Sequence, residues 1–591
     1  MNKRWDLNKL YKSFSDQCFR TDREKFTRLL DLLEEWETGQ TGEPHEQAEY
    51  FLRQLIGTEE IYTKLAAYSQ LTVSVDARNE EALKIIEDLE KEAARLTGPM
   101  VRFQKWLGEL DDLNGLINRS PLLQEHRFYL EELVEINRYL LSEKEETIIA
   151  ELTRTGSSAW TRLQEKLTST LMVEMEIKGE QKLLPLPEVR NMAFKKDPGL
   201  RRSAYDAELK AYQKIEEPVA AALNGIKGEV LTLSERRGFR DPLEETLLKF
   251  RMERKTLETM LEAMRDFLPH FREFYRAKAR LLNREGGLPF YDLFAPLGEV
   301  EMEFSLEEAK VFIVKNISDF SQEMGALYEQ AFSEHWMDTE PREGKRSGAF
   351  CYNITPIGES RILSNFTGSF ADLTTLAHEL GHAYHGHCLN GESILNTNYP
   401  MPLAETASIF SETIVTNAAI KVADAEQAFA ILESRISQAG QVIVDIYSRF
   451  VFESNLFKRR KQASLSVDEL KDLMLRAQLE IYGEALNREY LHPYAWLSKP
   501  HYYSAGTNYY NFPYAFGLLF GLGIYALYLE RGESFLDDYK NLLKTTGRNK
   551  AAEVAGMVAI DLNSRSFWDN SLAVIKNDIN EFLALAENRS G

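Results

Sequence analysis

LAHELGHAYHGH, residues 376–387, holds four of the ten histidines of the chain and contains the pattern H-E-x-x-H. Residues four apart in an α-helix lie about 40° apart around the axis and one turn apart along it. His378 and His382 therefore share a helix face, and both imidazoles can reach one zinc ion at about 2.0–2.1 Å. Glu379 points about 100° away from His378 around the helix axis, so we expect its carboxyl to lie close to a zinc-bound water and not to bind the ion itself. The stretch predicts a zinc site with a glutamate general base.

The other two histidines are not predicted to bind the same ion. His385 lies on the same face but about 10 Å along the axis from His378, too far for one tetrahedral ion to take both. We expect His385 to line a cleft. His387 falls on the opposite face or past the end of the helix, and we interpret it as a surface or capping residue.

A zinc site of this type needs a third protein ligand and an open fourth position. The metzincin pattern is not met, because His385 stands at its glycine position and Cys388 at its last histidine position. Cys388 would be an unusual ligand for this motif. The acidic candidates that follow are Glu392, in a loop, and Glu405 and Glu412, on a helix predicted over 400–421.

A glutamate from a second helix usually completes a two-histidine zinc site. Glu405 and Glu412 share a helix face but are too far apart to bind one ion together. The sequence favours Glu405 as the ligand, which leaves Glu412 free to accept the second ring N–H of a ligand histidine.

Helical patterns dominate the rest of the chain. Apolar residues recur at i, i+3, i+4 and i+7 over residues 22–39, 79–96, 126–152 and 305–332. The helix that carries the histidines is predicted over 369–386, from a pair that resembles a capping box, Ser369 and Asp372, to Gly386. The apolar run 515–529 is shorter than the roughly 20 residues that span a bilayer, and it predicts a buried helix.

Strand-like segments are few. Residues 347–354 and 360–367 stand just before the histidine-rich helix and are separated by a connector typical of a hairpin. We expect the second segment to be an edge strand with which an extended peptide could pair. The sequence predicts a mainly α fold with a small β-sheet beside the H-E-x-x-H helix. A proline-marked break at 183–191 predicts an N-terminal helical lobe, residues 1–187, and a catalytic lobe, residues 188–591.

Composition narrows the possible partners and compartments. The chain has 591 residues and a formal net charge of −21, from 71 basic and 92 acidic residues. This balance disfavours nucleic acids and anionic membrane surfaces as partners, because both would be repelled. Three cysteines provide no disulfide framework and suit a reducing compartment. The N-terminus has no apolar core of a secretory signal, so we expect a cytoplasmic protein.

Several segments together resemble the oligoendopeptidase F family of thimet-oligopeptidase-like zinc metallopeptidases. They are HELGHAYH (378–385), LAETASIFSE (403–412), WDLNKLY (5–11), KRSGAF (345–350) and HYYSAGTNYYNFPYAFG (501–517). The resemblance runs from end to end. It implies a two-lobed, clam-shaped helical zincin with a deep internal channel, which admits short unstructured peptides and excludes folded proteins.

Carried over residue by residue, the resemblance implies one zinc ion bound by His378, His382 and Glu405, with Glu379 as the general base. His501, Tyr510 and Tyr514 would contact the substrate or stabilise the oxyanion. The connector 504–508 differs in length from the thimet-type pattern, so Tyr503 and Tyr509 are alternatives for the tyrosine roles. Pro513 favours a helix that begins near it, with Tyr510 in the preceding loop.

The expected reaction is hydrolysis of internal peptide bonds in short unstructured oligopeptides. A zinc-bound water attacks the scissile carbonyl, and Glu379 accepts its proton and passes it to the leaving amine. The sequence leaves two other functions open. The chain could be a helical binding protein with a structural zinc, or an enzyme that hydrolyses a non-peptide amide. Structural zinc sites usually have four protein ligands and are rich in cysteine. The aromatic residues of YNFPY could also be core packing.

Overall fold

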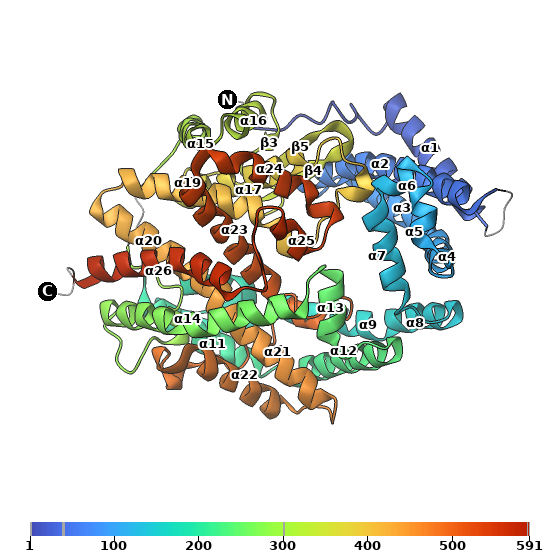
Figure 1. Ribbon diagram of the computed structural model, residues 1–591. Coiled ribbons are helices and arrows are strands. Elements are labelled where there is room, and N and C mark those ends of the chain that lie inside the picture. The colour runs from blue at the N-terminus through green and yellow to red at the C-terminus, as the bar shows by residue number, and fades with distance from the viewer. Residues whose placement is uncertain (1–2, 38–41, 299–301, 588, 590–591) are drawn as a thin grey trace. The chain divides into compact units, whose positions relative to one another are not determined.

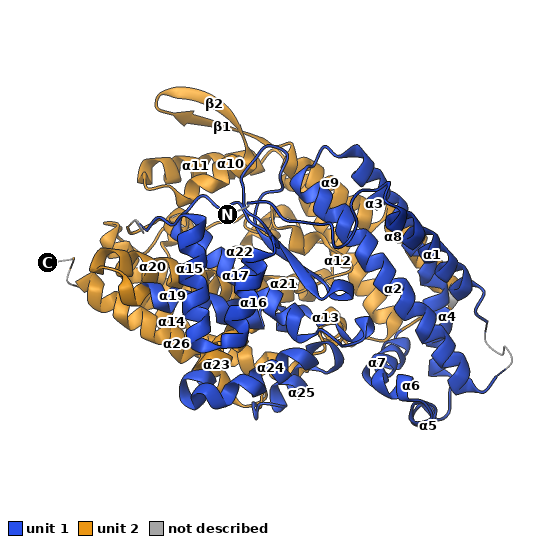
Figure 2. Ribbon diagram, turned by 90° about the horizontal axis from the view of Figure 1, so that it is seen from above, with its two compact units in different colours: residues 1–139, 302–419, 527–560 blue, residues 140–301, 420–526, 561–591 orange. Residues whose placement is uncertain are grey.

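The computed structural model describes residues 3–37, 42–298, 302–587 and 589, and most of them are helical (Figure 1). The prediction of a mainly α fold with a small sheet is confirmed. The chain divides into two compact units, each built from three separate segments (Figure 2). Unit 1 comprises residues 1–139, 302–419 and 527–560, and unit 2 comprises residues 140–301, 420–526 and 561–591. The lobe boundary predicted after residue 187 falls inside unit 2 and stays a prediction.

The helices of unit 1 are α1 (Gln17–Glu34), α2 (Pro44–Val75), α3 (Glu80–Ala93), α4 (Thr97–Gly108), α5 (Leu113–Asn118), α6 (Pro121–Glu125), α7 (Arg127–Asn137), α15 (Leu306–Phe320), α16 (Gln322–Ser333), α17 (Phe370–Cys388), α18 (Met401–Ala404), α19 (Thr406–Val422), α24 (Leu536–Thr545) and α25 (Ala551–Gly556). Helix α1 packs against α2 through buried side chains that include Phe19, Phe26 and Leu65.

The helices of unit 2 are α8 (Glu143–Thr155), α9 (Ser157–Ser169), α10 (Leu186–Asn191), α11 (Pro198–Tyr212), α12 (Glu216–Arg237), α13 (Pro242–Lys249), α14 (Arg254–Leu281), α20 (Ala425–Gly440), α21 (Ile446–Arg460), α22 (Val467–Tyr482) and α26 (Arg565–Glu587). A π-helical turn, η6 (Gln441–Asp445), joins α20 to α21. Helix α23 (Phe512–Arg531) begins in unit 2 and ends in unit 1, and the last three residues of α19 belong to unit 2. The core of unit 2 includes Leu223, Phe452 and Trp496.

Several predicted helices have different ends from those expected. The pattern at 22–39 belongs to α1, which begins earlier because Asp16 caps its N-terminus; its predicted end at residue 39 lies outside the described residues. The patterns at 126–152 and 305–332 each form two helices, because Ser142 and Ser321 accept backbone N–H groups and start α8 and α16. The pattern at 79–96 forms α3 and a short 3₁₀ turn.

A three-stranded sheet packs against the H-E-x-x-H helix α17 within unit 1. Its strands are β3 (Met337–Asp338), β4 (Phe350–Ile354) and β5 (Glu359–Leu363), in the order β3-β5-β4. The two predicted strands exist, but the expected edge position of the second is wrong. β5 pairs on both sides, in parallel with β3 and antiparallel with β4, and all five of its residues are buried. Within the described sheet, β3 and β4 are the two edge strands, and β4 is the longer of them.

Unit 2 holds a hairpin that our sequence analysis did not predict, β1 (Met172–Ile177) paired with β2 (Glu180–Pro185). Lys178 and Gly179 both have positive φ and form its two-residue turn. The alternating apolar and acidic residues of VEMEI before a Lys-Gly pair are the sequence signal for this hairpin. Pro185 ends β2, and Pro187 lies in the first turn of α10.

The apolar run 515–529 lies inside α23, and most of its first ten residues are buried, as the sequence predicts. Among the described residues, one helical stretch, 512–548, is long and apolar enough to cross a membrane when only its length and composition are considered. Of its most apolar window, 61% is buried within the protein, which is typical of a core helix.

Candidate active site

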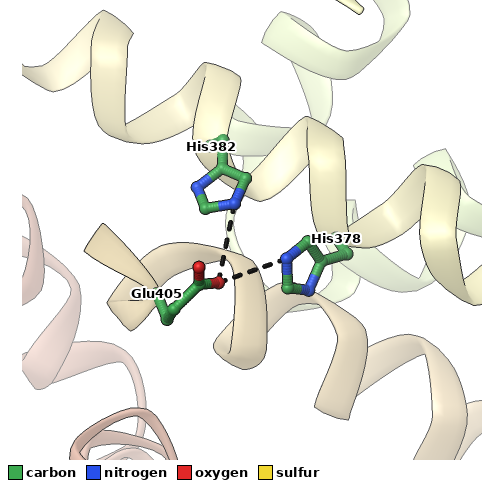
Figure 3. A group of neighbouring side chains, drawn as sticks. All are labelled: His378, His382 and Glu405. Carbon is green, nitrogen blue, oxygen red and sulfur yellow. Dashed lines mark ion pairs between the residues drawn. The ribbon is translucent and has the colours of Figure 1, made fainter. Parts of the chain in front are cut away.

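His378, His382 and Glu405 form a cluster in unit 1 in which one ligand atom from each residue lies within 4.8 Å of the others (Figure 3). Oε2 of Glu405 is 3.2 Å from Nε2 of His378 and 3.6 Å from Nε2 of His382. Ligand atoms around a tetrahedral ion with bonds of about 2.0–2.1 Å are separated by roughly 3.4 Å. The donor set and its spacing therefore suit one tetrahedral metal ion with an open fourth position.

The helix that carries the two histidines begins and continues for identifiable reasons. Ser369 and Asp372 form the predicted capping box at the start of α17. The predicted stop at Gly386 is wrong, because α17 continues to Cys388. A Cβ atom at residue 386 would lie 2.4 Å from side-chain atoms of Asn353 on β4. Glycine therefore allows the close approach of the helix to the sheet at this position and does not end the helix.

A second glycine brings the two metal-binding segments together. A Cβ atom at Gly381 would lie 2.5 Å from the carbonyl oxygen of Ala407 and 2.6 Å from Cα of Ser408. Only glycine allows α17 to approach the first turn of α19 this closely. Gly381 stands at a variable position of H-E-x-x-H, so the motif does not indicate its role. The glycine inside a helical pattern was the signal that another backbone lies close.

Glu405 occupies a break between two helices. The helix predicted over 400–421 is interrupted at this residue, which separates α18 from α19. Two hydroxyl groups bond to carbonyls at the break: Thr406 donates to Leu403 and Ser408 donates to Glu405. Ser408 also donates to Oε2 of Glu405 at 2.8 Å and so orients the carboxylate.

Each histidine is also held by a second partner. Nδ1 of His378 lies 3.0 Å from Oε2 of Glu412, and a ring nitrogen of His382 is hydrogen-bonded to the carbonyl of Ala404. When one nitrogen of an imidazole ring donates its N–H to such a partner, the tautomer is fixed. The other ring nitrogen then keeps a lone pair that can bind a metal ion. Glu412 therefore lies where the sequence expected it, behind a candidate ligand.

Electrostatics make the cluster receptive to positive charge. Burial by itself would lower the pKa of His378, but its hydrogen bonds to Glu405 and Glu412 raise that pKa to about 10. Burial and the neighbouring His378 lower the pKa of His382 to about 4. Burial would raise the pKa of Glu405, but the bond to His378 and both imidazoles lower it to about 2. A cation at the centre of the cluster would take the place of the proton on His378.

Glu379 is only 7% exposed and lies beside the cluster on α17. Burial raises the pKa of its carboxyl to about 7, with smaller contributions from the charges of Glu405 and Glu412. The positive charge of His378 opposes this rise most strongly, and the backbone N–H of Cys351 on β4 also opposes it by donating to the carboxyl. A carboxyl with a pKa near neutrality can both accept and release a proton under physiological conditions.

The alternative ligands are engaged elsewhere in unit 1. Glu392 lies 3.5 Å from Lys544 and 3.2 Å from Arg548, and Cys388 is buried at the end of α17. His387 is partly exposed and lies 3.7 Å from Glu323, as expected of a surface residue.

His385 does not line a cleft, contrary to expectation. It is fully buried, stacks on Tyr399 with a centroid distance of 4.0 Å, and Nε2 lies 2.8 Å from Oγ1 of Thr546. Its face of α17 is covered by other parts of unit 1, which the spacing of the histidines could not indicate.

The C-terminal residues named by the resemblance form a separate cluster in unit 2. The rings of His501 and Tyr510 are 5.5 Å apart, those of His501 and Tyr514 are 6.1 Å apart, and those of the two tyrosines are 5.8 Å apart. Tyr510 precedes α23, as predicted, and Tyr514 lies in its first turn. The alternatives Tyr503 and Tyr509 are 0% and 5% exposed and belong to the packed interior.

A buried polar network supports the loop between His501 and Tyr514. Nζ of Lys227 lies 2.8 Å from both Oε1 of Glu453 and Oδ1 of Asn508, and Asn511 donates to Oε2 of Glu453 at 3.2 Å. Lys227 and Glu453 are 0% and 1% exposed. The network has no pattern in the sequence, because its residues come from three distant segments. A lysine inside the apolar face of α12 was the available signal.

Comparisons with known proteins identify the family of the chain. A sequence profile described as Peptidase family M3 matches residues 191–574, and one described as Oligopeptidase F matches residues 109–172. An oligoendopeptidase F homolog from Borreliella burgdorferi is 25% identical over 536 residues, 88% of each chain. Another, from Lactococcus lactis subsp. lactis, is 24% identical over 613 residues, 99% of this chain and 97% of the relative.

The fold is also found among solved structures. Oligoendopeptidase-F from Enterococcus faecium matches with a TM-score of 0.72 at 18% identity, covering 96% of this chain and 99% of that chain. At this identity the likeness concerns the fold. The first profile matches well over half of the chain. The chain therefore belongs to peptidase family M3 and is a metallopeptidase of oligopeptides, of the oligoendopeptidase F type.

Proposed function

We propose that the protein is a zinc-dependent endopeptidase that hydrolyses internal bonds of short, unstructured peptides. The observation that carries the proposal is the spacing of His378, His382 and Glu405, which suits one tetrahedral ion, with a buried glutamate beside it. Two imidazoles and a carboxylate are the donor set of catalytic zinc sites, which keep a fourth position open. A closed structural site would require a fourth protein ligand, and the described residues supply a cluster of three.

The two histidines and Glu405 would hold one zinc ion, which when bound acidifies a coordinated water and polarises the scissile carbonyl. Glu412 and the carbonyl of Ala404 keep the imidazoles oriented toward it. Glu379 accepts the proton of the attacking water and returns it to the leaving amine. The burial that raises its pKa to about 7 suits a group that must do both.

His501, Tyr510 and Tyr514 are proposed to contact the substrate or donate a hydrogen bond to the developing oxyanion. Their rings form one cluster, and both tyrosines are partly exposed, whereas Tyr503 and Tyr509 are packed in the interior. A phenol in such a role contributes about 3 kcal/mol when it is aligned with the transition state. This assignment rests on the resemblance and on the clustering within unit 2.

The substrate is proposed to be an extended peptide that pairs with β4. β4 is an edge strand, and it carries the Cys351 backbone N–H that reaches Glu379. Backbone pairing supplies affinity with little demand on side chains. The two-lobed channel implied by the family would restrict substrates to short, unfolded chains. The free state of the three cysteines supports a reducing, cytoplasmic location.

The ligand assignment is tested by metal content. Zinc is measured by atomic emission after dialysis in the parent, Glu405→Ala and Glu392→Ala. We expect Glu405→Ala to lose zinc, because a ligand is removed, and Glu392→Ala to retain it, because Glu392 is paired with two cations instead. Zinc lost from Glu392→Ala and kept by Glu405→Ala would contradict the assignment.

The reaction is tested with Glu379→Gln, which should keep zinc and lose nearly all peptidase activity, because an amide cannot act as the base. Activity is measured on a short unstructured peptide, a permanently unfolded full-length chain, a folded protein and a small acyl-amide. Rapid internal cleavage of the full-length chain would contradict the restriction to short peptides. A preference for the acyl-amide would favour a non-peptide amidase.

A further inference from the structure

Unit 2 encloses a cavity of about 330 Å³ that the proposed chemistry does not use. Its walls come from α10, α11, α14, η6, α21 and α22, and from the segments 193–194, 290–294 and 492–499, with Ser437 of α20, all within unit 2. Part of the wall is aromatic, with Tyr205, Phe290, Tyr291, Phe294 and Tyr482. Cavities of this size with aromatic walls and a few polar groups are typical of sites for small molecules.

The charged residues of the wall are mostly neutralised in pairs. Arg449 forms an ion pair with Asp445, Nε of Arg190 lies 3.5 Å from Oε1 of Glu208, and Arg201 is paired with Asp292 at 2.7 Å. Lys499 is different: within the part of the chain that the structure describes, no hydrogen bond or ion pair of its ammonium group is found. Its side chain lines the cavity and is only partly exposed. The wall therefore carries one uncompensated positive charge.

An ammonium group in this position is poorly solvated. Burial, together with the charge of Arg449, lowers the pKa of Lys499 to about 8, although the charges of Asp445 and Glu208 partly oppose this. A carboxylate beside Nζ would supply the missing partner, and a hydrogen bond between two charged groups is about twice as strong as one between neutral groups. The cavity is therefore complementary to a small anion that also carries an aromatic or aliphatic group.

Two features connect the cavity with peptides. Lys499 lies two residues before His501, and the charges of Lys499 and Arg449 both act on the His501 imidazole. The wall also includes Gln441 and Asp445 of the π-helical turn η6, and such turns occur frequently at functional sites. The cavity thus adjoins the cluster to which a substrate-contacting role is assigned above.

We infer that this cavity binds the free C-terminal end of a short peptide, with the α-carboxylate on Lys499 and the last side chain between the aromatic walls. The inference rests on the proposed peptidase function for its choice of ligand. Uncut substrate and released product both carry such an end.

Binding is measured by isothermal titration calorimetry on the zinc-loaded Glu379→Gln variant, so the result does not depend on hydrolysis. The probes are the dipeptide Ala-Phe, its C-terminal amide and acetate. We expect the free acid to bind at least about tenfold more tightly than the amide, since a charge-assisted bond is lost with the amide. Adding Lys499→Met should remove this difference, and adding Lys499→Arg should keep it.

Lys214→Met is the matched control, because it removes a lysine of the same unit that is exposed and paired with Glu174. It should leave the preference for the acid unchanged. The inference is overturned if acid and amide bind equally, if neither binds, or if the preference survives Lys499→Met. Acetate binding as tight as that of Ala-Phe would also overturn it, because the cavity would then be a site for small anions only.

Kinetics of the parent enzyme separate the two sources of the carboxylate. If the substrate supplies it, C-terminal amidation of a fluorogenic peptide should raise KM in the parent and not in Lys499→Met. If the product supplies it, amidation should have no effect, and added Ala-Phe should change the rate in the parent only. Loss of zinc or of hydrolysis would contradict the proposed function without changing the calorimetric result expected for this cavity.

Discussion

Replacement of Glu412 should weaken zinc binding although Glu412 is not predicted to touch the metal. Its Oε2 lies 3.0 Å from Nδ1 of His378, and its side chain is 28% exposed, so the bond is partly screened by solvent. A partner of this kind typically contributes 10- to 100-fold to metal affinity. The corresponding free energy is about 1.4–2.7 kcal/mol.

Two substitutions separate charge from hydrogen bonding. Glu412→Gln keeps an acceptor for the ring N–H and removes the charge, so we expect a loss of zinc affinity near tenfold. Glu412→Leu removes both, so we expect a loss toward 100-fold. The dissociation constant of zinc is measured by competition with a chelator at fixed pH and ionic strength.

Glu323→Gln is the matched control, because Glu323 also faces a histidine of α17, His387, at 3.7 Å. His387 is not a predicted ligand, so this variant should bind zinc as the parent does. Parental affinity in Glu412→Leu would refute the positioning role. If Glu323→Gln lost as much zinc affinity as the Glu412 variants, the loss would come from the lower negative charge of the protein and not from the contact with His378.

Four further changes test other parts of the structure. Gly381→Ala should force α17 away from α19, cost about 1–3 kcal/mol of stability and lower zinc affinity, whereas unchanged zinc binding would contradict the close-approach argument. Burial lowers the pKa of His385 to about 3, so the unfolded state binds more protons than the folded state as the pH falls through 6.5. Between pH 7 and 5.5 the parent should therefore lose about 1 kcal/mol more stability than His385→Gln, as measured by denaturant titration. Lys227→Met should destabilise by about 3–5 kcal/mol because Glu453 is left charged and buried, and Lys227→Met with Glu453→Leu should recover much of this loss. At least one of Tyr510→Phe and Tyr514→Phe should lower kcat and kcat/KM together at constant zinc content; parental kinetics in both would assign these tyrosines to packing.

The sequence by itself determined where the two candidate metal-binding histidines of unit 1 lie relative to each other. H-E-x-x-H fixes two imidazoles on one helix face, because the period of the α-helix allows no other arrangement of residues four apart. The period also excluded His385 and His387 from the same ion. Apolar periodicity predicted a mainly α fold, and β-branched and aromatic residues located two strands beside the site.

Tertiary structure decided what depends on contacts between distant segments. Glu405 approaches the histidines because Gly381 lets α19 contact α17, and it lies at the break between α18 and α19. The order β3-β5-β4 depends on a two-residue strand too short to have a pattern of its own. The burial of His385 depends on Tyr399 and Thr546, which are far away in the sequence. Local periodicity reports which face of an element a residue occupies, whereas burial, pairing and charge compensation depend on what the rest of the chain places against that face.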